Sequence, residues 1–141
     1  MPDKIVPARD AAALAHSGDS VTTSGLVGAG VPDGLLQALG DRFAQEGHPR
    51  DLTLLFAAGP GKGKGRGLDR LAAPGLVRRN IGGHCGLIPN LGARALALAA
   101  EIEGGNFPPG VISHLYRDIA ADKPGTLTHV GLETFRRGGE P

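Results

Sequence analysis

Three glycine-rich segments are the parts of this sequence best suited to chemistry. They cover residues 24–32 (SGLVGAGVP), 57–67 (AAGPGKGKGRG) and 81–86 (IGGHCG). A glycine lacks a Cβ, so its backbone amide can approach an anion or a developing oxyanion closely. Where such a segment leads into a helix, the unpaired amides of the first turn add further donors. The three segments therefore predict a ligand site made largely of main chain.

The first segment contains Gly25, Gly28 and Gly30 and ends at Pro32 and Asp33, a pair typical of a helix start. Its Gly-x-x-Gly-x-Gly spacing is neither the dinucleotide fingerprint Gly-x-Gly-x-x-Gly nor a P-loop, which ends in Gly-Lys-Ser or Gly-Lys-Thr. Two interpretations stay open. The glycines bring backbone amides to a ligand, or they only ease packing in a strand-to-helix turn.

The second segment alternates glycine with positive charge, through Gly59, Gly61, Lys62, Lys64 and Arg66. Its three cations can meet the phosphates of a nucleotide-like ligand. The same alternation is also typical of a mobile, solvated loop, and both interpretations stay open.

The third segment sets His84 beside Cys85, directly after Gly82 and Gly83. A cysteine and a histidine can form a nucleophile and its base. Adjacent residues on an extended segment point to opposite faces, however, so His84 is badly placed to deprotonate Cys85. We interpret the pair as a small buried thiol and a loop histidine.

Short apolar runs alternate with stretches of helical periodicity along the chain, which is typical of repeated strand-helix units. This pattern predicts an α/β fold with a mostly parallel sheet flanked by helices. Because ligands bind beyond the carboxyl ends of the strands in such sheets, the three glycine-rich segments should share one functional edge. The expected strands cover residues 20–24, 52–58, 76–81 and 105–107, and the expected helices cover residues 10–16, 32–47, 68–72, 91–102 and 111–119.

Composition excludes several classes of function. The formal net charge of +1 gives no broad cationic surface for nucleic acid or anionic lipid, and the chain has no Trp and only one Tyr for stacking on bases. The single cysteine excludes an internal disulfide and a cysteine-based zinc site, and the five histidines show no paired metal spacing. With neither a membrane-length apolar run nor an apolar signal core at the start, we expect a cytoplasmic protein without a metal.

Longer strings along most of the chain are similar to those of family I coenzyme A transferases, and most closely to the single-chain acetate or propionate CoA-transferases. The string that resembles the family's first signature is Gly18–Pro32. The others, in chain order, are Lys4–Val6, Gly47–Thr53, Ala57–Gly59, Arg66–Leu68, Ile81–His84, Gly110–Ala120 and Lys123–Thr128.

This resemblance implies the CoA-transferase-like α/β fold, an oligomer, and a role in short-chain fatty acid metabolism. Members move CoA from an acyl-CoA to a small carboxylic acid, so CoA is a substrate and no cofactor is permanently bound. A glutamate attacks the thioester and carries CoA as a glutamyl-CoA thioester, which divides one transfer into two easier steps. The substrate- or CoA-binding residues that we expect are Gly25, Gly28, Gly30, Gly59, Gly61, Lys62, Gly82 and Gly83.

The chain also departs from the family pattern. The catalytic glutamate of such enzymes belongs to a Ser-Glu-Asn-Gly type motif in their second half, and no such string occurs here. Pro109 stands where members tend to have a glutamine, and Cys85 where they tend to have an aromatic residue. We therefore expect residues 1–141 to be a partial amino-terminal, alpha-type domain that is inactive alone, either a truncated gene product or a fragment that awaits a second chain with the glutamate. The alternatives are a non-catalytic module for CoA or another phosphorylated ligand, and a structural subunit.

Overall fold

Four parallel strands form one sheet in the order β1-β2-β3-β4. The computed structural model describes residues 4–61, 64–84, 88–97 and 102–132. The parallel α/β sheet expected from the sequence is confirmed, and each observed strand overlaps its expected range. The strands are β1 (Ser20–Thr22), β2 (Leu52–Phe56), β3 (Val77–Gly82) and β4 (Glu103–Asn106).

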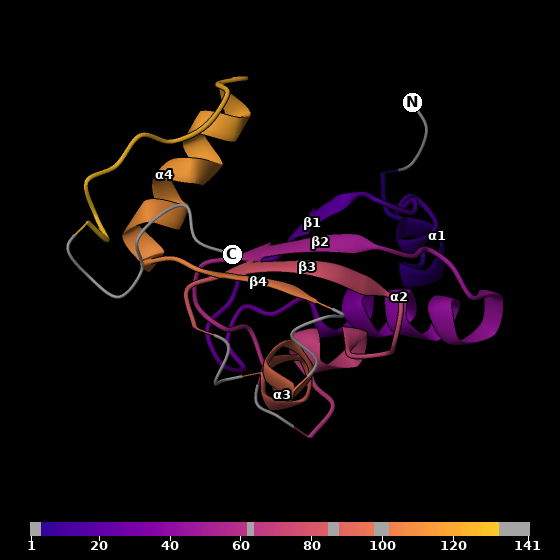
Figure 1. The fold of residues 1–141 in the computed structure, drawn as a ribbon. Helices are drawn as coiled ribbons and strands as arrows, with labels where there is room; N and C mark the ends of the chain where they lie inside the picture. The colour runs from indigo at the N-terminus through magenta and orange to yellow at the C-terminus, as the bar shows by residue number, and fades with distance from the viewer. Residues whose placement is uncertain (1–3, 62–63, 85–87, 98–101, 133–141) are drawn as a thin grey trace.

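Helices connect the strands and cover mainly one face of the sheet (Figure 1). On this face, alternate residues of β2 (Leu52, Leu54 and Phe56) enter a buried apolar cluster with leucines of α2, η1 and α3. Leu36 of α2 and Leu68 of η1 are both at most 4% exposed. The elements are α1 (Ala8–Ala12), α2 (Asp33–Glu46), the 3-10 helix η1 (Gly67–Leu71), α3 (Pro89–Ala97) and α4 (Pro109–Ala120).

Helix α4 lies beyond the carboxyl ends of the strands, on the side of the sheet away from α2 and α3 (Figure 1). The Tyr116 hydroxyl donates a hydrogen bond of 3.4 Å to the carbonyl of Leu55, whose side chain points away from the main cluster. A groove of about 490 Å³ runs between β1 and α4 and is lined by Val21, Leu55, Tyr116 and Ile119 among others. No helix in the described part of the chain is long and apolar enough to cross a membrane.

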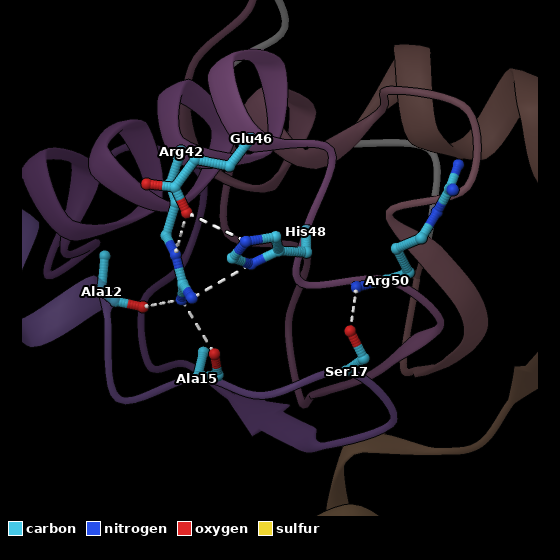
Figure 2. A network of polar contacts seen from close by, with 7 residues as sticks. All are labelled: Ala12, Ala15, Ser17, Arg42, Glu46, His48 and Arg50. Carbon is cyan, nitrogen blue, oxygen red and sulfur yellow. Dashed lines mark hydrogen bonds and ion pairs between the residues drawn. The ribbon is translucent and has the colours of Figure 1, made fainter.

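Helix α1 begins and ends earlier than the expected range 10–16. The Pro7 carbonyl accepts the amides of Asp10 and Ala11, which starts the helix two residues before Asp10. Its carboxyl end faces Arg42 of α2, whose Nη1 donates to the carbonyls of Ala12 and Ala15, each at 2.9 Å (Figure 2). A cation at this position satisfies carbonyls that the ending helix leaves unpaired.

Figure 2 also shows how the same guanidinium holds the loop after α2. Arg42 donates from Nε to Glu46 at 3.0 Å, and its Nη2 lies 3.2 Å from Nδ1 of His48. Nearby, the backbone amide of Arg50 donates to the Ser17 hydroxyl at 2.9 Å. These bonds join the segments that enter β1 and β2 at the amino-terminal edge of the sheet, opposite the glycine-rich loops.

Two helix ends agree with the sequence expectations in detail. Helix α2 starts at Asp33 directly after Pro32, and it ends at Gly47, which adopts the left-handed conformation with φ of 72°. Helix α3 starts at Pro89, two residues before the expected start, and the expected last residues 98–102 lie mostly outside the described part of the chain.

Candidate functional site

The first glycine-rich segment is a tight hairpin at the carboxyl end of β1. Leu26 and Ala29 exchange backbone hydrogen bonds of 3.1 and 3.0 Å, which closes a two-residue turn. Gly25 has φ of +112°, and a Cβ there would lie 2.6 Å from Cγ2 of Val31. Gly25 is therefore required by backbone conformation and packing. Gly28 is exposed at the tip of the turn, whereas Gly30, which is also exposed, lies at the base of the hairpin beside Gly25 and has a positive φ of 66°.

The second segment closes on itself. Gly59, Pro60 and Gly61 are buried, and the amide of Leu68 donates to the carbonyl of Pro60 at 3.0 Å. A Cβ on Gly67, where φ is +63°, would overlap that carbonyl. Glycine at position 67 thus allows the two ends of the loop to cross.

The cations of this loop lie at its exposed side. Lys64 and Arg66 are exposed, and Lys64 has φ of 55°, in the left-handed region. Lys62, which we expected to bind substrate, lies outside the described residues. The two described ends of the loop are anchored to each other, and the choice between a phosphate site and a mobile, solvated loop stays open.

Asp33, the first residue of α2, provides the anchor. Its Oδ1 accepts the amide of Gly67 at 2.8 Å and Nε of Arg70 at 2.9 Å, while its Oδ2 accepts Nη2 of Arg70 at 2.8 Å. These bonds, above all the pair with Arg70, hold the pKa of Asp33 well below its ordinary value. Asp33 therefore joins the first loop to the second.

The third segment packs tightly against the end of β2. The amide of Gly83 donates to the carbonyl of Phe56 at 3.3 Å. A Cβ on Gly82 would overlap the Phe56 ring, and a Cβ on Gly83 would overlap the carbonyl oxygen of Ala57 and lie 3.1 Å from Cγ of Pro109. Both glycines thus permit close approach of β3 to β2 and to the start of α4.

A side-chain amide completes this edge. With its nitrogen turned toward the backbone, Asn106 at the end of β4 donates to the carbonyls of Gly83 at 2.7 Å and Gly82 at 3.0 Å. His84 is exposed, and Cys85 lies outside the described residues, so the relation of the two side chains stays a prediction.

Asp69, in η1, supports the adjacent helix. Its Oδ1 accepts the amides of Asn90 and Leu91 at 3.0 and 3.3 Å, at the start of α3. The residue is only 5% exposed, and burial raises the pKa of its carboxyl group. Across the described residues, no group of three or more His, Cys, Asp or Glu side chains is arranged to hold a metal ion.

The structure thus links the three loops in sequence along one edge. Asp33 joins the first to the second, and the Ala57–Gly83 contact joins the second to the third. Sequence reasoning missed the Asp33–Arg70 pair, because nothing local relates residues 37 positions apart. It also missed Asn106, although a polar side chain ending an expected strand is a usable indication of a site.

The match to known proteins agrees with this architecture. The family model described as coenzyme A transferase matches residues 6–141. This chain belongs to the coenzyme A transferase family. It is 36% identical over 132 residues to a caffeate CoA-transferase of Acetobacterium woodii, covering 94% of this chain and 25% of that enzyme. It is 29% identical over 140 residues to an acetate CoA-transferase subunit alpha of Escherichia coli K12, covering 99% of this chain and 60% of that subunit.

Solved transferase structures share the fold. The apoenzyme of the acyl-CoA transferase YdiF from Escherichia coli O157:H7 superposes with a TM-score of 0.83 at 31% identity, over 93% of this chain and 25% of that one. A thioester complex of YdiF with CoA superposes with a TM-score of 0.81 at 31% identity, over 92% and 26% of the two chains. The chain therefore spans about a quarter of the length of these transferases.

Proposed function

We propose that residues 1–141 form a partial amino-terminal, alpha-type domain of a CoA-transferase. Its substrates are an acyl-CoA and a small carboxylic acid, and the glutamate nucleophile comes from sequence outside these residues. The observation that carries the proposal is the linked set of loops at the carboxyl edge, in a fold that superposes on a transferase in thioester complex with CoA.

In this proposal the residues of the loops face the thioester, leave space for close packing, or contact phosphate. Gly28 at the tip of the hairpin and Gly30 at its base are both exposed, so their main chain can face the reacting thioester, where amide donors stabilise a developing oxyanion. Gly25, Gly82 and Gly83 leave the space that lets these backbones come close. Gly59 and Gly61 are buried at the base of the second loop, and Lys62 on that loop meets phosphate groups of CoA.

In this proposal the glutamate comes from sequence outside residues 1–141, either on the same polypeptide or on a second chain. Support for a second chain comes from a relative named as a subunit alpha, because the match covers 99% of this chain and 60% of that subunit. Support also comes from the groove between β1 and α4, because β1 is an edge strand and Ile119 in the groove is 53% exposed. A partner that completes the fold would cover these groups and exclude water from the reaction.

A transfer assay tests this proposal. We expect the purified chain, mixed with acetyl-CoA and propionate, to give no propionyl-CoA. Addition of a chain with a Ser-Glu-Asn-Gly type segment, sought in the DNA directly downstream, should restore transfer with ping-pong kinetics. Turnover by residues 1–141 alone would contradict the proposed division of the active site.

Calorimetry with CoA distinguishes the non-catalytic alternative. Binding of CoA together with failure of every glutamate-bearing partner to restore transfer would favour a module that only binds a phosphorylated ligand. Absence of both binding heat and a thermal shift at millimolar CoA would reject retained CoA binding by the chain alone.

A further inference from the structure

We propose that Asp33 is a positioning residue that holds Lys64 and Arg66 in place for the phosphate groups of CoA. The inference rests on the proposed function and adds to it a residue that works through another part of the site. The inference is drawn from the side chain of Asp33, which bonds the start of α2 to both ends of the segment Gly67–Arg70.

The geometry gives Asp33 control over the base of the loop. Its three hydrogen bonds, all between 2.8 and 2.9 Å, hold the amide of Gly67 and the guanidinium of Arg70 at once. A carboxylate that accepts a two-pronged guanidinium and an amide together fixes direction as well as distance. Gly67 directly follows Arg66 and is the first residue of η1. Holding its amide therefore sets the direction in which residues 64–66 approach η1.

The packing of η1 on α2 gives this contact a rigid base. A Cβ on Gly40, two turns along α2 from Asp33, would lie 2.8 Å from the carbonyl oxygen of Arg70. The two elements therefore touch through their backbones at one point and through the Asp33–Arg70 pair at another. Because Asp33 also accepts the amide of Gly67, η1 is fixed to α2 both at its first residue and near its last.

The charges leave Lys64 and Arg66 available to a ligand. Asp33 is paired with Arg70, and Arg66 is also near enough to help lower the pKa of Asp33. Within the described residues, however, neither Lys64 nor Arg66 has a carboxylate within ion-pair distance. Both side chains are exposed, on a loop whose other end, Gly59–Gly61, is buried. A phosphorylated ligand supplies the negative charge that they lack, and a loop already held in place loses less entropy on binding it.

The test compares Asp33→Asn and Arg70→Gln with a matched control, Asp118→Asn. Asp118 is also a carboxylate with two side-chain partners, Lys123 at 2.8 Å and Thr126 at 2.7 Å, but it lies on α4, away from the loop. Affinities are measured for CoA, for adenosine 3′,5′-bisphosphate and for pantetheine, which has the thiol arm without phosphate. Hydrogen exchange of the amides of residues 65–68 is measured without ligand.

We expect both loop variants to speed exchange at these amides and to raise the Kd for CoA and for the bisphosphate about tenfold. Their affinity for pantetheine should stay unchanged, and the control should match the wild type in every measurement. A purely structural role would affect all three ligands alike, so the selective loss is the diagnostic result.

The contrary results are separate from those of the proposed function. Unchanged exchange in Asp33→Asn, or faster exchange with unchanged CoA affinity, would overturn the positioning role while wild-type CoA binding left the proposed function standing. Failure of the wild-type chain to bind CoA and the bisphosphate would overturn the role of Lys64 and Arg66 and the CoA-binding part of the proposed function together.

Discussion

Substitution of Gly82 by alanine tests how strictly the edge of the sheet depends on close packing. A Cβ at this position would overlap the far end of the Phe56 ring and lie 3.0 Å from its Cε1. Phe56 is completely buried, so the ring has no solvent to move into. Gly82 has no positive φ, and the cost is therefore steric rather than conformational.

Overpacking of a dense core costs about 1–3 kcal/mol, and an overlap this severe belongs at the upper end, near 3 kcal/mol. Gly104→Ala on β4 is the matched control, because a Cβ there meets nothing within 4 Å. The control should be neutral or gain up to about 1 kcal/mol, since alanine reduces the entropy of the unfolded chain. The two substitutions are chemically the same, but only Gly82→Ala should destabilise the protein.

Phe56→Leu supplies the rescue. Leucine lacks the ring atoms that the new methyl group would meet, and alone it should cost about 1–2 kcal/mol for lost buried surface. In the double variant with Gly82→Ala, the methyl group occupies part of the vacated space, so we expect a favourable coupling of at least about 1 kcal/mol.

Urea denaturation followed by circular dichroism measures the free energy of unfolding of the wild type, the three single variants and the double variant. With an m-value of about 2 kcal/mol/M, the Gly82→Ala midpoint should fall by more than about 1 M. Equal midpoints for Gly82→Ala and Gly104→Ala, or strictly additive effects of Gly82→Ala and Phe56→Leu, would refute the assigned contact.

Three further experiments examine other contacts. Asp33 has a lowered pKa, so its ion pair with Arg70 should stabilise the fold fully above about pH 4 and lose that effect on acidification. Asp33→Asn should lower the free energy of unfolding by about 1 kcal/mol at neutral pH, a modest value because the Asp33 side chain is 39% exposed. The difference in urea midpoint between wild type and Asp33→Asn should therefore close as the pH falls. Burial raises the pKa of Asp69, so wild type should gain stability relative to Asp69→Asn as the pH falls through that raised value. Thermal melts of both proteins at several pH values test this, and a wild type that loses stability relative to Asp69→Asn on acidification would contradict it. Gly40→Ala should lower the melting temperature because its Cβ would press on the Arg70 carbonyl, whereas Gly34→Ala on the same helix meets nothing and should raise it; parallel shifts would count against the α2–η1 contact.

Much of the architecture could be predicted because it depends on local patterns. The short apolar run at residues 52–58 indicated the strand that is observed as β2, and the helix between Pro32 and Gly47 was bounded by residues with known terminal preferences. Errors occurred at element ends. Helix α1 starts at Ala8 because the Pro7 carbonyl accepts its first amides, and it finishes where Arg42, 30 residues from Ala12, takes the free carbonyls.

The candidate site could be predicted only in outline. Three glycine-rich loops at one edge follow from parallel strands, but the differing burial within those loops does not. Gly59 and Gly61 are buried because the loop crosses itself at Gly67, whereas Gly28 and Gly30 are exposed on a hairpin. The sequence pattern of these glycines is similar, and their surroundings decide what each one does.

The sequence by itself determined the order of strands and helices, the shared edge of the loops and the resemblance to coenzyme A transferases, because periodicity, helix termini and motifs are properties of neighbouring residues. Only the tertiary structure decided that Asp33 belongs to Arg70 and Gly67. That choice requires η1 to lie against α2 with Gly40 at the crossing point, and such packing depends on the shapes of surfaces that are distant in sequence.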